Sequence, residues 1–221
     1  MRPLRSAGVA GLVALFLTAL AVGDAGPRPV TFSREQVGRL PPDWKAARTG
    51  EGEGSVWKVV ADDTAPGKTG HALAQIAEGP NRLFNLCLLD QSSFRDGELS
   101  VRARAVAGKL DQGGGLLWRC RDADNYYVCR YNPLEKNLRL YYVKEGKRTQ
   151  LATREDLALP EGRWFTVTVR HKGDRIACGL EGKTYIEVTD GTIPDAGRVG
   201  LWTKADARTH FDLLRVAPVG R

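Results

Sequence analysis

Motifs that would mark a metal site or a catalytic nucleophile are absent from this sequence. The three histidines, His71, His171 and His210, are widely separated, and no serine lies in a Gly-x-Ser-x-Gly motif. Four cysteines are present, but their spacing matches no zinc-ligand pattern. We therefore assign no metal ligand and no catalytic residue from the sequence.

A sustained helical period is also missing. From Ser55 onward, short runs alternate between apolar and polar residues and are separated by glycine, aspartate and asparagine. This pattern predicts an all-β fold, a two-sheet jelly-roll sandwich over residues 55–217, whose N-terminal strand could begin near residue 30. Residues 23–54, with their glycines, prolines and charges, are expected to form an N-terminal arm and loop.

Long apolar runs are limited to one. Arg2 and Arg5 precede the run from Ala7 to Val22, which is shorter than the roughly 20 residues that span a bilayer. A small-residue site at Ala19 to Ala21 favours a cleaved signal peptide over residues 1–22, with a membrane anchor as the alternative. We expect an exported protein, periplasmic or extracellular, with no transmembrane segment after signal cleavage.

Charge of one sign is not concentrated anywhere, although the formal net charge is +7. The basic residues are spread through the expected strands, so we predict no nucleic-acid partner and instead expect glycans or cell-surface polymers. Export would allow a disulfide between Cys120 and Cys129 across a hairpin. Four small buried thiols, with Cys87 and Cys178 as the other two, are the alternative.

One hairpin carries most of the functional information. Residues 113–131 predict two strands joined by a turn at Asp122 to Asn125. Side-chain alternation places one set inward, namely Leu116, Trp118, Cys120, Tyr127, Cys129 and Tyr131. The opposite set points outward and comprises Leu117, Arg119, Arg121, Tyr126, Val128 and Arg130, to which the next strand adds Arg139 and Tyr141.

An outward face of arginines and aromatic rings suits a sugar. Aromatic rings stack on the C–H face of a pyranose, and guanidinium groups donate paired hydrogen bonds to hydroxyls or carboxylates. We therefore predict the ligand-binding residues to be Arg119, Tyr126, Arg130, Arg139, Tyr141, Trp202 and Lys204. The alternative is a solvated face whose arginines pair with neighbouring acids.

The same hairpin, with Gly162 to Trp164, Gly197 to Asp206 and Phe211-Asp212, resembles the concanavalin A-like lectin/glucanase superfamily. Within it, the chain is most similar to bacterial 3-keto-disaccharide hydrolase-like domains over about residues 30–217. The resemblance implies a curved jelly roll with any ligand on the concave sheet. It gives fold more firmly than function, and the Glu-x-Asp-x-x-Glu motif of the laminarinase-type glucanases is missing.

Three functions remain open from the sequence. The first is an exported carbohydrate-binding domain that recognises a glycan without turning it over. The second is a hydrolase or lyase of 3-keto-disaccharides or related sugars, which requires a titratable group beside the arginines. The third is a structural or protein-binding domain of the cell envelope. No cofactor is predicted, a structural calcium ion stays open, and the oligomeric state is not predicted.

Overall fold

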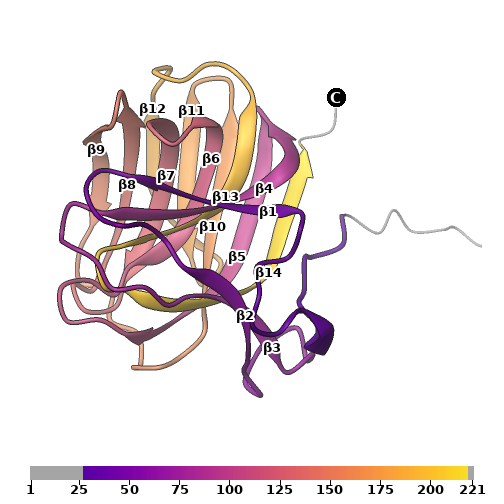
Figure 1. The fold of residues 1–221 in the computed structure, drawn as a ribbon. Helices are drawn as coiled ribbons and strands as arrows, with labels where there is room; N and C mark the ends of the chain where they lie inside the picture. Colours follow the sequence, from indigo (N-terminus) through magenta and orange to yellow (C-terminus); the bar gives the residue numbers. More distant parts are fainter. Residues whose placement is uncertain (1–26, 219–221) are drawn as a thin grey trace, which may run out of the picture.

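The protein is a sandwich of two antiparallel sheets, as the sequence predicts. A computed structural model describes residues 27–218, so the expected signal peptide lies outside the described residues. Each sheet has seven strands, and the sheets stack face to face around one core (Figure 1). A short 3₁₀ helix at Arg34–Gln36 is the helical element of the described chain. No helix there is long and apolar enough to cross a membrane.

The front sheet carries the glycine-led hairpin at its centre. Its order is β1 (Trp44–Thr49), β4 (Phe84–Phe94), β13 (Gly197–Lys204), β6 (Gly114–Asp122), β7 (Asn125–Asn132), β8 (Asn137–Lys144) and β9 (Lys147–Arg154). Gly115 permits the close approach of β6 and β7, because a Cβ there would lie 2.0 Å from the carbonyl oxygen of Cys129. The predicted entry of a strand at the glycine run is therefore confirmed.

The back sheet contains the remaining strands. Its order is β12 (Lys183–Thr189), β11 (Arg175–Leu180), β10 (Phe165–Lys172), β5 (Gly97–Ala107), β14 (Arg208–Pro218), β3 (His71–Gln75) and β2 (Trp57–Ala61). Its inward residues match the predicted alternation, for Leu99, Val101 and Ala103 are buried in the core. They pack against Trp118 and Tyr127 of the front sheet in the same cluster.

A histidine joins the two sheets inside this core. The indole Nε1 of Trp118 donates a 2.9 Å hydrogen bond to Nδ1 of His171, and the Tyr127 ring meets the imidazole edge-on. Burial lowers the pKa of His171 to about 4, so the imidazole is neutral near pH 7. His171 is therefore a core residue, which the sequence could not distinguish from a site residue.

The N-terminal segment contains a strand that we expected to be loop. Residues 23–54 were predicted as an arm and loop, yet β1 pairs with β4 from Trp44 to Thr49. Trp44 is buried beside Phe32, so two aromatic side chains anchor the segment on the core. Because only the two ends of β1 are buried, its sequence gives little alternation.

The face assignment of the hairpin holds except at one bulge. Leu116, Trp118 and the inward residues of β7 lie in the core. Arg119, however, has a φ of 47°, and the register of β6 with β13 shifts by one residue between Leu117 and Cys120. One extra residue reverses the side-chain parity beyond it. The prediction was therefore wrong for Cys120, which lies on the outer face, and for Arg119, which does not.

Arg119 instead ties together loops at one end of the sandwich. Its side chain is fully buried and donates to the carbonyl oxygens of Arg95, Ile193 and Gly173 at 2.8–2.9 Å. A further hydrogen bond reaches Asp96 at 3.3 Å. Arg119 thus takes part in the structure of the loops, away from the outer face of the front sheet.

All four cysteines are buried free thiols. Cys129 belongs to the core between the sheets, whereas the bulge moves Cys120 to the opposite face of the front sheet. Two side chains on opposite faces of one sheet cannot be bridged, so the alternative of buried thiols is confirmed.

Candidate functional site

The outer face of the front sheet carries a second apolar cluster. Three of its aromatic members, Phe84, Tyr141 and Trp202, form what we call the aromatic floor. Trp202 is fully buried and lies 5.4 Å from Phe84 between ring centroids. The other members are Leu86, Leu88, Leu117, Cys120, Tyr126, Val128 and Val143. No third layer of sheet or helix covers this face within the described chain, so large side chains and loops bury one another there.

Arg148 lies directly over the aromatic floor. Its guanidinium carbon is 4.5 Å from the ring centroid of Tyr141, 4.7 Å from that of Phe84 and 6.0 Å from that of Trp202. These distances are those of cation–π contacts. Burial lowers the pKa of Arg148, but an arginine stays protonated at any physiological pH. Within the described chain, its side chain makes no ion pair and donates no hydrogen bond.

A hollow of about 440 Å³ opens beside Arg148. It is bordered by the loops before and after the floor strands and by the β8–β9 turn. Its lining residues are Gly50, Glu51, Asn81, Arg82, Phe84, Gly146, Arg148 and Lys204. Three of them are cationic and one is acidic, so the hollow is positively charged.

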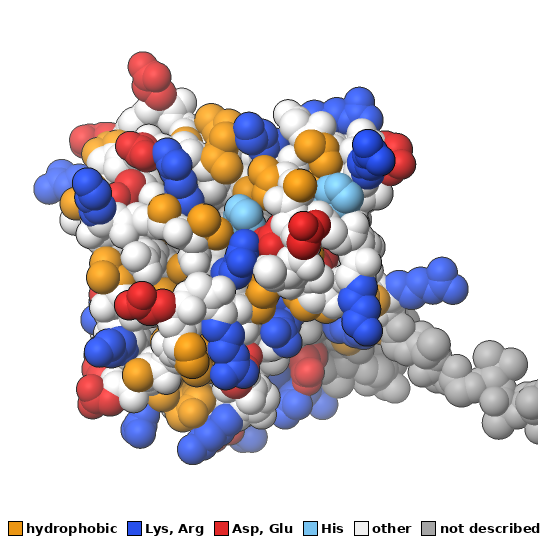
Figure 2. Space-filling model, turned by 90° about the horizontal axis from the view of Figure 1, so that it is seen from below, with side chains coloured by type: hydrophobic (Ala, Val, Ile, Leu, Met, Phe, Trp, Pro, Cys, Tyr) orange, Lys and Arg blue, Asp and Glu red, His pale blue; other side chains and the backbone are white. Residues whose placement is uncertain are grey.

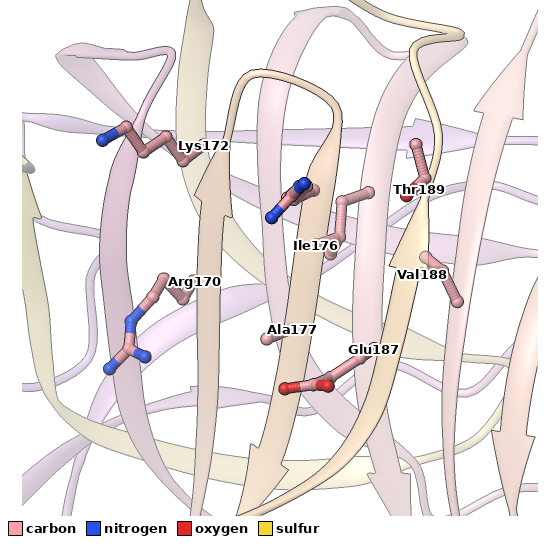
Figure 3. A pocket seen from close by; sticks show the side chains of 8 residues that line it. Arg170, Lys172, Ile176, Ala177, Glu187, Val188 and Thr189 are labelled. Carbon is pink, nitrogen blue, oxygen red and sulfur yellow. The ribbon is translucent and has the colours of Figure 1, made fainter.

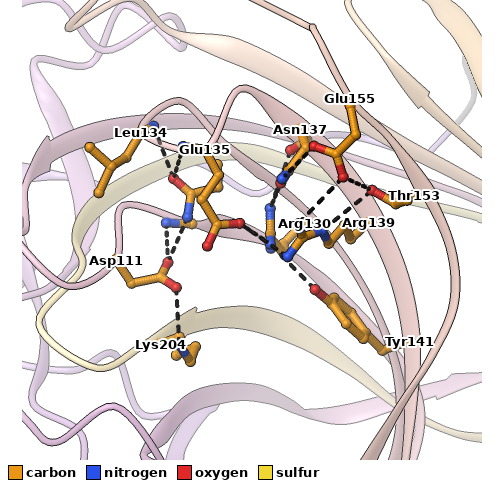
Figure 4. A network of polar contacts seen from close by, with 12 residues as sticks. Asp111, Arg130, Leu134, Glu135, Asn137, Arg139, Tyr141, Thr153, Glu155 and Lys204 are labelled. Atoms are coloured by element: carbon orange, nitrogen blue, oxygen red, sulfur yellow. Dashed lines mark hydrogen bonds and ion pairs between the residues drawn. The ribbon is translucent and has the colours of Figure 1, made fainter.

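A polar network adjoins the hollow on β7 and β8 (Figure 4). Arg130 pairs with Glu135 at 2.7 Å and donates to the hydroxyl of Tyr141 at 3.3 Å. Arg139 pairs with Glu135 at 3.3 Å and with Glu155 at 3.4 Å. Partial burial alone would raise the pKa of Glu135, but the two arginines outweigh it and lower that pKa. Glu135 is therefore ionised, and these guanidiniums are already neutralised.

Asp111 connects this network to the hollow. Its Oδ2 lies 3.4 Å from the ammonium of Lys204, and its Oδ1 accepts from the backbone of Gly113 at 2.6 Å. Burial raises the pKa of Asp111 above its ordinary value. The loop that carries it is held by Asp206, which accepts the N–H groups of residues 109–111. Asp206 therefore has a structural role in this loop.

The seven predicted ligand-binding residues do not all lie together in the structure. Tyr141 and Trp202 form the floor, and Lys204 lines the hollow. Arg130 and Arg139 lie in the adjoining network, while Tyr126 is fully buried with its hydroxyl bonded to Thr49. Arg119 lies elsewhere, as described above. The structure thus brings together most of the predicted set without showing that any of them binds.

Sequence reasoning missed Arg148. The alternation places strands at residues 138–144 and 149–152, which leaves this residue in the turn between them. In the structure β9 begins at Lys147, and Arg148 pairs across the hairpin with Val143 of the outer face. The available signal was the Glu145-Gly146 turn, which is typical of a short hairpin and would extend the strand to Arg148.

A second titratable cluster lies on the back sheet. His210 Nδ1 is 2.7 Å from Oδ2 of Asp62, and Arg104 contacts the same oxygen at 2.7 Å. Thr64 donates to the other oxygen of Asp62 and accepts from the indole of Trp164. Burial lowers the pKa of His210 although Asp62 opposes this, so the imidazole is available as a neutral base.

The back sheet also has a hollow, of about 520 Å³, on β10, β11 and β12 (Figure 3). Arg170 and Lys172 rise from one side and Glu187 and Thr189 from the other, with Ala177 between them (Figure 3). No ring lies beneath these charges. The end of the molecule seen from below likewise shows basic side chains scattered among acidic ones (Figure 2). Among the described residues, no group of histidine, cysteine or acidic side chains could hold a metal ion.

The paired antiparallel sheets define a jelly roll of the concanavalin A-like class. Residues 39–217 match the 3-keto-alpha-glucoside-1,2-lyase-like domain family, and the chain belongs to that family. No match was found among curated proteins.

Solved structures share this fold at low sequence identity. The carbohydrate binding module CBM66 from Bacillus subtilis superposes with a TM-score of 0.63 at 16% identity, over 85% of this chain and 99% of that one. A Bacillus subtilis protein of unknown function with a galectin-like fold gives 0.57 at 13%, over 81% and 90%. The exoplasmic/lumenal domain of VIP36, in its Ca2+/Man-bound form, gives 0.53 at 14%, over 86% and 91%.

Proposed function

We propose that the protein binds a glycan in the hollow beside Arg148. The observation that carries this proposal is an unpaired guanidinium stacked on three aromatic rings and facing a hollow of about 440 Å³. A volume of this size is typical of small-ligand sites, and the lining combines the ring of Phe84 with charged and amide side chains. The carbohydrate-binding module and the lectin-like structures that share the fold support the same function.

Each lining residue contributes a different contact to the proposed glycan. Arg148 presents its N–H edge to sugar oxygens while its plane stays fixed on the floor. Arg82 and Lys204 add donors at the rim, and the amide of Asn81, bonded to Lys204, orients that ammonium. Arg130 and Arg139 hold the strands behind the hollow through Glu135. We further propose that binding takes place outside the cytoplasm, which the basic and apolar start of the sequence supports.

A glycan array followed by calorimetry tests the proposal. The wild-type protein is expected to retain at least one oligosaccharide, and Arg148→Ala should weaken that binding by about tenfold or more, as for loss of a charged hydrogen bond. Arg170→Ala is the matched control, because Arg170 lies on the back sheet and pairs with Glu98 at 2.9 Å. Retention of no sugar at millimolar concentration, or equal binding by Arg148→Ala, would contradict glycan binding here.

Membership of the family favours a second candidate, the cleavage of a 3-keto-glucoside. A 1,2-elimination removes the C2 proton, which the neighbouring ketone makes acidic, and expels the glycosidic oxygen from C1. The reaction needs a base for that proton and an acid for the leaving oxygen. His210 and Asp62, 2.7 Å apart, are a titratable pair of the described chain that could serve as the base.

Turnover of a 3-keto-α-glucoside would distinguish the two candidates. Elimination predicts that the wild-type protein releases the alcohol from C1 and converts the 3-keto sugar into a conjugated enone, and that this rate falls by about 100-fold or more in His210→Gln. Arg208→Gln is the control, since its side chain lies on the same strand and pairs with Glu78 at the surface. Turnover that is unchanged in both His210→Gln and Asp62→Asn would remove this pair from the reaction.

A further inference from the structure

Arg148 differs from its neighbours in lacking a counter-charge. Arg130 and Arg139 each lie within ion-pair distance of Glu135, and Lys204 lies 3.4 Å from Asp111. Arg148, although half-buried, has no carboxylate within that distance in the described chain. Burying a charge without a partner is unfavourable, and proteins usually supply one nearby. The position of the missing anion is therefore the hollow itself.

The rest of the lining agrees with an anionic occupant. Arg82, like Arg148, makes no ion pair in the part of the chain described. Glu51 is the acidic residue of the lining, and it pairs with neither arginine. The unpaired charges that face the hollow thus have a positive balance. A cleft with such a balance attracts anions and raises their local concentration.

The geometry of Arg148 also restricts how an anion is held. Its guanidinium carbon lies 4.5 and 4.7 Å from the ring centroids of Tyr141 and Phe84, which fix its position, and its N–H groups have no acceptor in the described chain. Two parallel N–H donors match the two oxygens of a carboxylate or sulfate. Lysine could not replace it, because an ammonium has no planar fork and stacks poorly.

We propose that the glycan bound in this hollow is acidic, and that its carboxylate or sulfate pairs with Arg148. This inference rests on the proposed glycan-binding function and names its substrate class. The sugar ring then lies toward Asn81 and Arg82, where the rim offers donors and acceptors for hydroxyl groups. Neutral sugars of the same size lack the group that completes the charge of Arg148.

Matched ligands that differ only in charge provide the experiment. Oligogalacturonate is compared with its methyl ester, and a sulfated oligosaccharide with its desulfated form, by calorimetry on the full chain. The acidic member of a pair is expected to bind at least about tenfold more tightly than its neutral counterpart. The preferred pair tells whether the carboxylate or the sulfate is the group recognised. Binding should also weaken as salt is raised, because the contact is between charges.

Variants separate this inference from the underlying function. Arg148→Gln should remove the preference for the acidic ligand, Arg148→Lys should restore only part of it, and Arg170→Gln should keep it. If Arg148→Gln weakened the binding of the acidic and the neutral ligand equally, the proposed glycan binding would be retained, but the proposal that the glycan is acidic would be contradicted. Tight binding of neutral glycans alone would do the same. Failure of every glycan to bind would overturn the proposed function together with the inference.

Thermal unfolding shows whether a loss of binding in Arg148→Gln is caused by a loss of folding. Arg148 lies on the surface of the floor and holds no loop, so Arg148→Gln should melt within a few degrees of the wild type. A variant that melts normally yet keeps the full preference for acidic ligands would overturn the proposal directly.

Discussion

Arginines lie on the outer faces of both sheets, but the side chains that surround them differ. On the back sheet, Arg170 pairs with Glu98 at 2.9 Å and Arg163 pairs with Glu181 at 2.8 Å. On the front sheet, Arg148 rests on three rings and makes no ion pair within the described chain. The comparison teaches that a binding face is distinguished by unpaired charge over an apolar base and not by its number of arginines.

The side chains beneath the charges explain the difference. The outward positions of β11 after Arg175 are the small residues Ala177 and Gly179, so the back hollow is a shallow trough between flanking polar rows. Outward positions of the front sheet include Tyr141 and Trp202, which fill the face and exclude water from beneath Arg148. A guanidinium on such a floor interacts more strongly with an added anion than one in open solvent does.

Removal of the floor is the largest perturbation that would break this comparison. Trp202→Ala deletes a fully buried indole and should lower the free energy of unfolding by about 3–5 kcal/mol, as large-to-small changes in cores do. Trp164→Ala, just before β10 of the back sheet, removes a ring that is 7% exposed and packs in a small cluster with Ala65 and Ala72, so it should cost less. Urea unfolding of the two variants gives the measurement, and equal losses would show that the faces are built alike.

Arg119 and Arg148 provide the next test. The sequence placed Arg119 among the ligand-binding residues and missed Arg148, whereas the structure places Arg148 beside the hollow and Arg119 among the loops. Arg119→Leu leaves three loop carbonyls and Asp96 without their donor, so we expect a loss of about 2–4 kcal/mol. Arg148→Leu removes no hydrogen bond and should cost less than about 1 kcal/mol. Chemical denaturation of both variants, with glycan binding as a second readout, is the measurement. A costly Arg148→Leu or a harmless Arg119→Leu would reverse their roles.

The same two residues show how far sequence reasoning reaches. Alternation correctly placed Trp118 and Leu116 inside and Tyr126 and Arg130 outside, because a period of two holds wherever a strand is regular. Alternation failed at Arg119, because a β-bulge there reverses which side chains point inward. No residue near Arg119 in the sequence indicates this bulge.

The candidate site was predicted only in part for a related reason. Tyr141, Trp202 and Lys204 were in the predicted set, since they lie in regular strands, whereas Phe84, the first residue of β4, was not. Which arginine remains unpaired depends on loops, for Glu135 and Glu155 lie beyond the ends of β7 and β9. Contacts between a strand and a distant loop end follow from the three-dimensional fold, which a short sequence pattern does not contain.

Acid unfolding tests the core between the two sheets, which is separate from both outer faces and so provides a reference for the comparison. The pKa of His171 is lowered by burial from 6.5 to about 4. Its contribution to stability is complete above pH 6.5 and is lost as pH falls toward 4, because the unfolded chain then binds a proton that the fold excludes. The loss should reach about 3 kcal/mol.

His171→Gln isolates this contribution. Glutamine keeps an acceptor for the indole of Trp118 but does not titrate, so the stability of the variant should fall less between pH 7 and pH 4 than that of the wild type. Urea unfolding at both pH values measures the difference. His71→Gln is the control, since His71 lies at the start of β3 outside the core cluster. Parallel pH profiles for all three proteins would disprove the assignment of acid sensitivity to His171.

The smallest expected effect is also the sharpest test of the opening comparison. Arg170 and Glu98 form an exposed pair, so Arg170→Gln should change the free energy of unfolding by less than about 0.5 kcal/mol. It should leave glycan affinity unchanged, because the back hollow has no ring beneath its charges and Glu98 already neutralises the guanidinium. If Arg170→Gln instead weakened binding as much as Arg148→Gln, the exposed trough and not the aromatic floor would hold the ligand. The double variant Arg170→Gln/Glu98→Gln removes both charges of the pair. Its glycan affinity should also be unchanged if the back face does not hold the ligand.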